Sequence, residues 1–287
     1  MTGLWLDGEI VADARQSMSL WNHSLHYGFG AFEGIRAYGS RAGQSRAFGV
    51  VEHIDRLWRT CATIRLRPNI PKAALVEGVE LLLERRAHDE SYIRPIIFMG
   101  DGLGALRDPR EVHSAILIWE WKTSEENGRP ISLGVSPYRR PDPGGYPSYV
   151  KATGNYLLSK SATLWAVDNG FDDAILLDHE GYVSEASAQN LFVVSGGRIS
   201  TPPVDRCLDG ITRKTVISLA SDHGIDVSER NIDPREFSDA DEVFLTSTAS
   251  EVLAVASIDG MSLPAAPGPM TSVLREAYRG LVLEGRR

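Results

Sequence analysis

The sequence predicts an α/β fold in two domains, and three observations lead to this prediction. Its 287 residues are long for a single domain. Strand-like runs and two amphipathic helices fill the first part of the chain, whereas apolar strands alternate with helices in the second part. A polar stretch, "TSEENGRP", separates the two parts. We therefore expect a small α/β domain over 1–122, a linker over 123–130 and a larger domain over 131–287.

The strands of the first domain are indicated by short apolar runs. "LWLDGEIV" at 4–11 predicts a hairpin, because two apolar runs flank the Asp7-Gly8 turn. "GAFEGIRAY" predicts a single strand over 30–38. Two further strands are expected over 92–100 and 114–121.

Two helices are predicted between these strands. Over 51–66, Ile54, Leu57 and Cys61 recur on one face at helical spacing. A second helix is expected from near Pro71, a residue suited to a first helical turn, to about His88.

The second domain is predicted to alternate strands and helices. Helices are expected over 155–170 and 210–224, each closed by a glycine, and after the loop at 262–269. Strands are expected over 131–138, 172–178, 190–194 and 241–248.

Composition narrows the class of protein. A net charge of -8 and a pI near 5.4 argue against a surface for nucleic acid or anionic membrane. Only two cysteines are present, so no disulfide framework is expected and the cytoplasm is the expected location. The first residues lack the pattern of a signal peptide, and no apolar run approaches the length of a membrane helix. No metal is expected.

Lys151 is the first candidate catalytic residue. The chain has 25 arginines and only five lysines, yet a lysine stands in "SYVKATGNY", between a proline-rich run and a helix. A lysine amine becomes a nucleophile when burial or a neighbouring cation lowers its pKa, which arginine cannot do. Taken alone, such a lysine is usually a solvated loop residue. Tyr156, five residues on, is expected in the first turn of the following helix, where a phenol can bond a cofactor's ring oxygen.

Glu185 is the second candidate, because it ends a strand-like run and small residues follow it. Small residues let a flat ring approach, and a carboxylate facing a pyridine nitrogen keeps that nitrogen protonated. A strand-end carboxylate in water is the alternative for Glu185 alone.

Three segments are candidates for binding an anion. "GITR" starts a helix at Gly210, so the amides of Ile211 and Thr212 can meet a phosphate. Ser247 and Thr248 offer hydroxyls after a strand. Arg56 lies opposite the apolar stripe of its helix and can give a phosphate a bidentate partner. An exposed helix arginine is the alternative for Arg56.

The order of these features resembles the fold-type IV, or class IV, pyridoxal-phosphate aminotransferases, and within them the branched-chain amino acid aminotransferases. The resemblance covers about residues 4 to 256. The stretches that carry it are "HYGFGAFEGIRAY", "HIDRL", "YIRPIIFMGDGLG", "VKATGNYL", "VSEASAQNLFVV", "LDGITR" and "STASEV".

The resemblance implies a pseudo-barrel core in the larger domain, pyridoxal 5′-phosphate as cofactor and a homodimer. It also implies transfer of an amino group between an L-amino acid, branched-chain in this subfamily, and 2-oxoglutarate. The mechanism is ping-pong, through a Schiff base on Lys151. Small-molecule amino acids and keto acids are then the partners, with no nucleic acid and no membrane.

The family's residue roles transfer to matching positions of this chain. Lys151 is implied as the catalytic residue. The cofactor would be bound by Lys151, Arg56, Tyr156, Glu185, Ile211, Thr212 and Thr248. The substrate would be bound by Tyr27, Phe32, Tyr92, Arg94, Trp121, Thr248 and Ala249. Arg94 is implied to meet the side-chain carboxylate of glutamate, and Tyr27 to reach the site of the neighbouring subunit.

This chain departs from the family pattern in three places that leave the preferred substrate open. "STASE" stands for the usual "GTAAE", the loop at 101–109 differs, and "WEWKT" replaces a "PWG"-like pattern. A transaminase for (R)-amines or D-amino acids and a pyridoxal-phosphate lyase of the aminodeoxychorismate type are the alternatives within the fold. A third alternative is a silent binding protein, against which the intact Lys151, Tyr156 and Glu185 argue.

Overall fold

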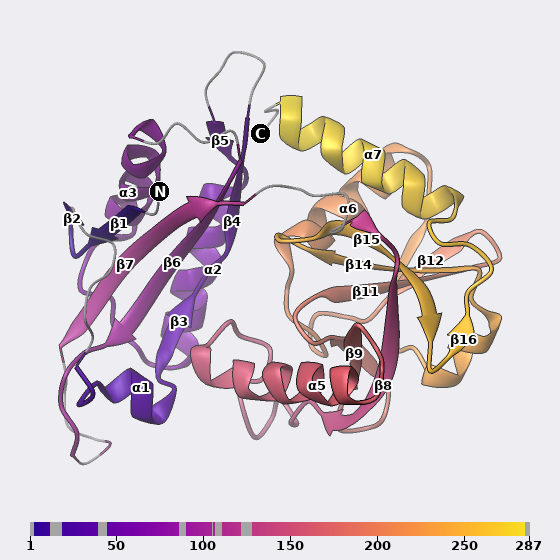
Figure 1. Ribbon diagram of the computed structural model, residues 1–287, viewed down its shortest axis with the longest axis horizontal. Coiled ribbons are helices and arrows are strands. Elements are labelled where there is room, and N and C mark those ends of the chain that lie inside the picture. Colours follow the sequence, from indigo (N-terminus) through magenta and orange to yellow (C-terminus); the bar gives the residue numbers. More distant parts are fainter. Residues whose placement is uncertain are drawn as a thin grey trace. The chain divides into compact units, whose positions relative to one another are not determined.

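The computed structural model describes residues 3–11, 19–39, 45–85, 90–104, 106, 111–121 and 128–284. The chain forms two compact units (Figure 1). The first unit comprises the described residues of Met1–Lys122, Val150–Asn155 and Val282–Arg287, and the second those of Thr123–Tyr149 and Tyr156–Leu281. Most of the expected linker over 123–130 lies outside the described residues.

The first unit contains a sheet in which β2, β1, β7, β6, β4 and β5 are neighbours in this order and β3 also pairs with β6. The strands are antiparallel, and β6 and β7 pair over their whole lengths. Their bounds are β1 Gly3–Leu6, β2 Glu9–Val11, β3 Gly30–Phe32, β4 Ile35–Gly39, β5 Ser45–Ala47, β6 Ser91–Met99 and β7 Val112–Glu120. The predicted hairpin is confirmed, since β1 pairs with β2 around a turn in which Asp7 and Gly8 both have positive φ.

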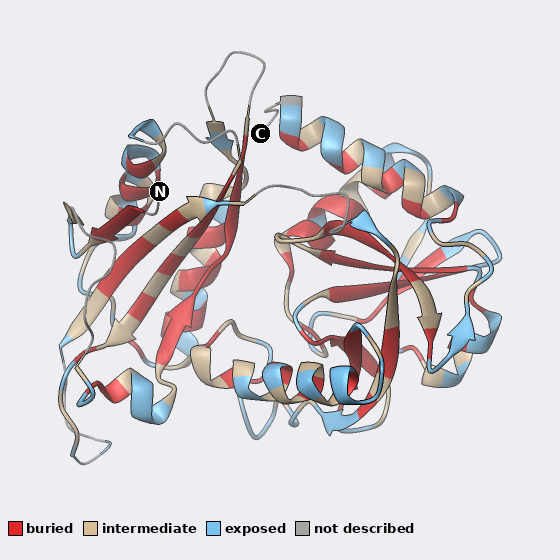
Figure 2. Ribbon diagram, viewed as in Figure 1, coloured by how far each residue is buried: buried red, intermediate tan, exposed pale blue. Residues whose placement is uncertain are grey.

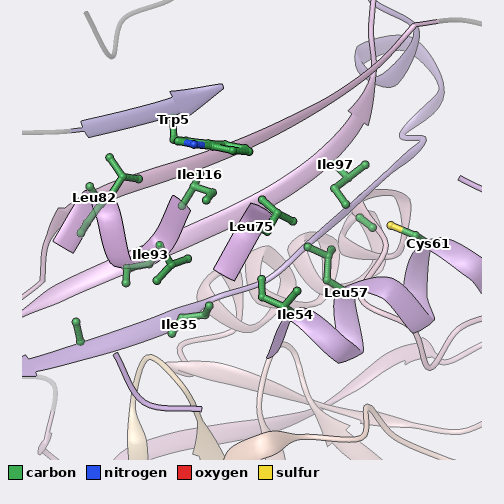
Figure 3. Close-up of a cluster of buried hydrophobic side chains, with 14 of the residues drawn as sticks. Trp5, Ile35, Ile54, Leu57, Cys61, Leu75, Leu82, Ile93, Ile97 and Ile116 are labelled. Atoms are coloured by element: carbon green, nitrogen blue, oxygen red, sulfur yellow. The ribbon is translucent and has the colours of Figure 1, made fainter. Parts of the chain in front are cut away.

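Helices α2 (Val50–Thr63) and α3 (Lys72–Glu84) cover one face of this sheet, and α1 (His23–Tyr27) is short. Figure 3 shows Ile54 and Leu57 of α2 and Leu75 of α3 packed against Ile93 and Ile116 of the sheet. These side chains are fully buried, and their burial is the main stabilisation of this unit. The amphipathic pattern of the first helix is therefore confirmed.

Two details of the first unit differ from expectation. The predicted strand over 30–38 is broken into β3 and β4, because Glu33 turns its carboxylate inward and the Tyr92 hydroxyl occupies the space beside Gly34. The second helix ends at Glu84, with Pro71 as its N-cap rather than within its first turn, and His88 lies outside the described residues.

The second unit contains a sheet in the order β10, β9, β8, β15, β14, β11, β12 and β13, with β16 paired to β15. In Figure 1, β8 crosses β11 and β14 at a steep angle, so the sheet coils into a half-barrel, which confirms the pseudo-barrel. The bounds are β8 Ile131–Arg139, β9 Asp173–Leu177, β10 Val183–Ala186, β11 Asn190–Ser195, β12 Arg198–Thr201, β13 Val227–Glu229, β14 Glu242–Ser247, β15 Glu251–Ile258 and β16 Met261–Ser262.

Within the described residues, this sheet is accompanied by the helices α5 (Tyr156–Asp168), α6 (Ile211–Asp222) and α7 (Pro269–Glu284). Short 3-10 helices lie at Thr153–Asn155 and Pro234–Asp239. In Figure 2 the strands are mostly buried, while α5 and α7 alternate buried and exposed residues along their lengths. All three predicted helices are confirmed, with small differences at their ends.

The crossover from β8 to β9 contains residues Val150–Asn155, which pack with the first unit rather than with the second, where the sequence placed them. Ala152 forms a β-bridge with Ala31, and the Thr153 hydroxyl donates to the carbonyls of Gly28 at 2.6 Å and Gly30 at 3.2 Å. These backbone contacts tie the lysine segment to β3.

Candidate active site

The candidate side chains of the first sheet lie on the face opposite α2 and α3. Side chains alternate along a strand, so Ile93 faces the helices whereas its neighbours Tyr92 and Arg94 face away from them. Trp119 lies directly opposite Tyr92 in the register, and their rings are 5.0 Å apart. Trp121 follows two residues later, and its ring lies 5.4 Å from that of Tyr92.

Arg94 lies among aromatic rings on this face. Its guanidinium carbon is 4.7 Å from the centroid of Phe32, 5.4 Å from that of Tyr92 and 5.9 Å from that of Trp119. The rings stabilise the cation through their negative faces. Within the described residues, the buried Nε of Arg94 and Nε1 of Trp121 have no hydrogen-bond partner. Since buried donors are rarely left unpaired, an acceptor from a ligand fits here.

Hydrogen bonds of its own N–H and carbonyl groups hold Lys151 in place. Its N–H donates to Thr60 Oγ1 at 3.3 Å, and its carbonyl accepts from the Phe32 N–H at 3.2 Å. The Lys151 ammonium lies 4.9 Å from the centroid of the Phe32 ring. Lys151 is half-buried, not a fully solvated loop lysine. Phe32 thus contacts both the lysine and Arg94.

Arg56 is buried on α2, only 7% exposed, rather than exposed as an isolated helix arginine usually is. It donates Nε to Glu33 Oε1 at 2.7 Å and Nη2 to Oε2 at 2.8 Å, and His53 Nδ1 lies 2.7 Å from the same Oε2. Burial raises the pKa of Glu33, but the charges and hydrogen bonds of Arg56 and His53 outweigh this, so the pKa lies well below its usual range. Glu33 is therefore ionised at neutral pH.

In the second unit, Glu185 is buried on β10 and contacted on both oxygens. Oε1 forms an ion pair with Arg140 Nη2. Oε2 accepts from Asn190 Nδ2 at 3.3 Å and from the Leu208 N–H at 3.2 Å. A cation thus meets one carboxylate oxygen and two N–H donors meet the other. Glu185 is thus not a strand-end carboxylate in water.

Asn190 also links Glu185 to the start of α6. Its Nδ2 donates to the Leu208 carbonyl at 2.8 Å, and a Cβ on Gly210 would lie only 2.0 Å from its Oδ1. Gly210 is the N-cap of α6, and no side chain of the described residues caps the helix. The first N–H groups of a helix have no partner within it, so the amides of Ile211 and Thr212 can bind an anion.

A tight turn joins β14 to β15 and carries Thr248 and Ala249. Ser247 Oγ accepts from the Ser250 N–H at 3.0 Å and thereby closes the turn. Ser247, in place of the family's glycine, therefore has a structural contact of its own. Glu251 follows with a φ of 58°, a strained value for a residue other than glycine.

Two further candidates lie at helix ends. Tyr156 is the first residue of α5, as predicted. Tyr27 ends α1 and is 47% exposed, with its ring 4.6 Å from that of His23. The loop at 101–109 is described only at 101–104 and 106, and in the "WEWKT" stretch residues 122 and 123 lie outside the described residues.

The predicted residues therefore fall in two sets, one in each unit. The first set is Tyr27, Phe32, Arg56, Tyr92, Arg94, Trp121 and Lys151, and the second is Tyr156, Glu185, Ile211, Thr212, Thr248 and Ala249. Sequence reasoning missed the residues that hold these side chains, namely Glu33, His53, Thr60, Arg140 and Asn190. Glu33, His53 and Asn190 lie within the family-like stretches, which was the available signal.

The small α/β unit carries a half-buried lysine, and the half-barrel unit carries a buried carboxylate and a helix start that no described side chain caps, as expected for the fold-type IV class. Residues 30–258 match the model of the family described as "Amino-transferase class IV". The chain belongs to this family and is an aminotransferase. The cofactor of the family is pyridoxal 5′-phosphate.

The relatives of this chain are named for a more specific activity than the family as a whole. The branched-chain-amino-acid aminotransferase of Pseudomonas aeruginosa is 35% identical over 97% of this chain and 92% of its own length. The branched-chain aminotransferase of the archaeon Thermoproteus uzoniensis, solved with norvaline, is 34% identical at a TM-score of 0.92 and matches 99% of this chain and 96% of its own. The branched-chain amino acid aminotransferase of Thermobaculum terrenum, solved in its PLP form, is 30% identical at a TM-score of 0.92 and matches 99% of this chain and 94% of its own.

Two features are absent from the part of the chain that the structure describes. None of the helices described is long and apolar enough to cross a membrane. In the same part of the chain, no group of three or more His, Cys, Asp or Glu side chains is placed to hold a metal ion.

Proposed function

We propose that this protein transfers the amino group of branched-chain L-amino acids to 2-oxoglutarate with pyridoxal 5′-phosphate as cofactor. The observation that carries the proposal is the environment of Arg94. This cation, whose buried Nε has no partner among the described residues, lies among Phe32, Tyr92 and Trp119, so the same place offers apolar surface and a partner for a carboxylate. An apolar side chain and the side-chain carboxylate of glutamate both fit such surroundings.

The residues present fit the cofactor. Lys151 supplies the amine that would hold its aldehyde covalently. Glu185, which Arg140 and the Leu208 N–H hold in place, suits a protonated pyridine nitrogen, and Tyr156 suits the ring oxygen. Arg56, Thr248 and the uncapped start of α6 at Ile211 and Thr212 suit the phosphate. When bound, the cofactor supplies an electron sink for the bond pair left at the substrate Cα.

Lys151 would act on the proton at the substrate Cα. As a base, the free lysine amine would take this proton from Cα, and as an acid it would return a proton at the carbon on the other side of the substrate nitrogen. Because hydrogen bonds from Phe32 and to Thr60 fix the lysine backbone, only the side chain has to move between the two positions.

The substrate would be held at both ends. Tyr92 and the turn at Thr248 and Ala249 would bind the α-carboxylate, and Phe32 and Trp121 would enclose the side chain. Arg94 would bind the side-chain carboxylate of glutamate or 2-oxoglutarate. Two substrates that use one pocket in turn require a ping-pong sequence, in which the first product leaves before the second substrate binds.

We further propose a cytoplasmic homodimer in which Tyr27 reaches the site of the neighbouring subunit. The exposure of Tyr27, at 47%, and of its neighbours Trp21, at 67%, and Leu25, at 54%, supports a contact surface in this segment.

The test is the visible absorbance of purified protein with added pyridoxal phosphate. We expect a band that fades with L-leucine and returns with 2-oxoglutarate. A band that responds to a D-amino acid or an (R)-amine, but not to L-leucine, would replace the substrate proposal. Pyruvate released without a keto-acid acceptor would instead indicate the lyase, and no band would overturn the proposal altogether.

A further inference from the structure

Helix α2 has a second buried stripe, which is polar. His53, Arg56 and Thr60 follow one another at spacings of three and four residues, so they lie on one side of the helix. They are only 2%, 7% and 1% exposed. The apolar stripe of Ile54, Leu57 and Cys61 is a separate face that packs into the core. The helix is therefore buried on two sides, and only one of them is explained by hydrophobic packing.

Two residues of the polar stripe, His53 and Arg56, bind Glu33, which is completely buried. Arg56 binds Glu33 side-on, through Nε and Nη2, and His53 Nδ1 lies 2.7 Å from Oε2. Burial lowers the pKa of His53, so a neutral ring donates its Nδ1–H to the carboxylate. The Gly34 N–H adds a longer contact at 3.3 Å.

A buried ion pair of this kind is weak evidence for stability, because well-packed apolar side chains of the same volume often stabilise a protein as much or more. The place of the cluster suggests another purpose. Glu33 follows Phe32, whose N–H binds the Lys151 carbonyl, and Thr60 of the same stripe accepts from the Lys151 N–H. Helix α2 and the segment Phe32-Glu33 thus hold both the Lys151 backbone and the Arg56 side chain in place.

We infer that Glu33 is a positioning residue that orients the Arg56 guanidinium toward the cofactor phosphate, with His53 orienting Glu33 in turn. The inference rests on the proposed function, in which Arg56 binds this phosphate. A side-on pair fixes the plane of the guanidinium and directs its far edge away from Glu33. The ordering of a long side chain is then complete before the phosphate binds.

A comparison with pyridoxal, which lacks the phosphate, distinguishes a role of Glu33 in phosphate binding from a merely structural role. The measurement is the dissociation constant of the apoprotein for pyridoxal phosphate and for pyridoxal, by absorbance titration. For Glu33→Gln we expect the constant for pyridoxal phosphate to rise about tenfold and that for pyridoxal to change less than about twofold. Equal losses for both ligands, no loss, or tighter binding of pyridoxal phosphate would overturn the inference.

Arg56→Met distinguishes a failure of this inference from a failure of the proposed function. If Arg56→Met leaves the preference for pyridoxal phosphate over pyridoxal unchanged, the proposed phosphate contact of Arg56 is wrong. If it abolishes the preference while Glu33→Gln does not reduce it, only the inference is wrong. In the double variant, Glu33→Gln is expected to have no further effect on the preference, because it acts through Arg56.

His53 offers a second pair of variants should Glu33→Gln fail to fold, since removing one partner of a buried ion pair is costly. The Asn amide nitrogen can take the place of Nδ1, whereas Leu removes the donor. We expect His53→Leu to reduce the preference for pyridoxal phosphate about threefold and His53→Asn to restore it. Equal preferences in the two variants would overturn the part assigned to His53.

Discussion

The guanidinium carbon of Arg94 lies 4.7 Å from the centre of the Phe32 ring, on the sheet face that carries Tyr92 and Trp119. The Lys151 ammonium lies 4.9 Å from the same ring. One phenyl ring therefore lies beside both the proposed catalytic lysine and the proposed substrate-binding arginine. An apolar substrate side chain beside Phe32 would meet a ring, while a carboxylate a little further along would meet Arg94.

Arg94→Gln is expected to weaken the binding of acidic substrates much more than that of L-leucine. Loss of a charge-assisted contact should raise the KM for 2-oxoglutarate and glutamate by about 10- to 100-fold. The half-reaction with L-leucine should change less than about threefold, because no carboxylate of its side chain meets Arg94. Single half-reactions followed by absorbance would measure both effects. Arg235→Gln, at an arginine that is 89% exposed, is the control. Equal losses for leucine and glutamate would contradict the role of Arg94.

Gly34→Ala is expected to displace Tyr92. A Cβ at Gly34 would lie 1.9 Å from the Tyr92 hydroxyl and 2.7 Å from its Cζ, so the ring must shift. We expect a loss of about 1–3 kcal/mol in the free energy of unfolding and a rise in KM for every amino acid substrate. Gly280→Ala in α7 is the matched control: nothing lies within 4 Å of its added Cβ, and it should gain about 0.5–1 kcal/mol. Unchanged kinetics in Gly34→Ala would show that Tyr92 does not hold the substrate.

Lys151→Ala is expected to fold normally and to lose turnover. The contacts that hold this segment come from its backbone, so the free energy of unfolding should change by less than about 1 kcal/mol. Turnover should fall by about 10⁴-fold or more, and the visible band with pyridoxal phosphate should disappear. Lys151→Arg should behave in the same way, since arginine keeps the charge but stays protonated. Appreciable turnover in either variant would exclude Lys151 as the base.

The His53 imidazole should make the protein sensitive to mild acid. Burial lowers its pKa below the ordinary value of 6.5, so the unfolded chain binds more protons there as the pH falls. The contribution of His53 to the free energy of unfolding is thus complete above pH 6.5, and it is lost as the pH falls from 6.5 toward the lowered pKa. Urea midpoints at pH 7.5 and 5.5 should show this loss in the wild type and a smaller loss in His53→Asn. His223→Asn, at an exposed histidine, should lose as much as the wild type.

The two cysteines are expected to be unreactive in the folded protein. Cys61 and Cys207 are each 1% exposed, and burial raises the pKa of the Cys61 thiol to about 12. Because the thiolate is the reactive form, titration with a disulfide reagent at pH 8 should find almost no thiol in the native protein. After unfolding in urea it should find both of the cysteines in the chain. A rapidly reacting thiol before unfolding would contradict this packing.

Much of the fold could be predicted from patterns among neighbouring residues of the sequence. The hairpin at Asp7-Gly8, the apolar stripe of Ile54, Leu57 and Cys61, and the start of a helix at Tyr156 depend on neighbours in the chain, and all are confirmed. The break between β3 and β4 could not be predicted in this way. It results from contacts of Glu33 with α2 and from the crowding of Gly34 by Tyr92, which lies far along the sequence.

The residue types needed for the chemistry can be recognised along the chain: a lysine where arginine is the common cation, a carboxylate among small residues, and a glycine before a helix. The surroundings of these residues could be learned only from the folded protein. It buried Arg56 against Glu33, enclosed Arg94 among aromatic rings and supplied Arg140 and Asn190 to Glu185. The physical reason is that burial and charge pairing depend on segments distant in sequence, while turns and helical periodicity depend on residues a few positions apart.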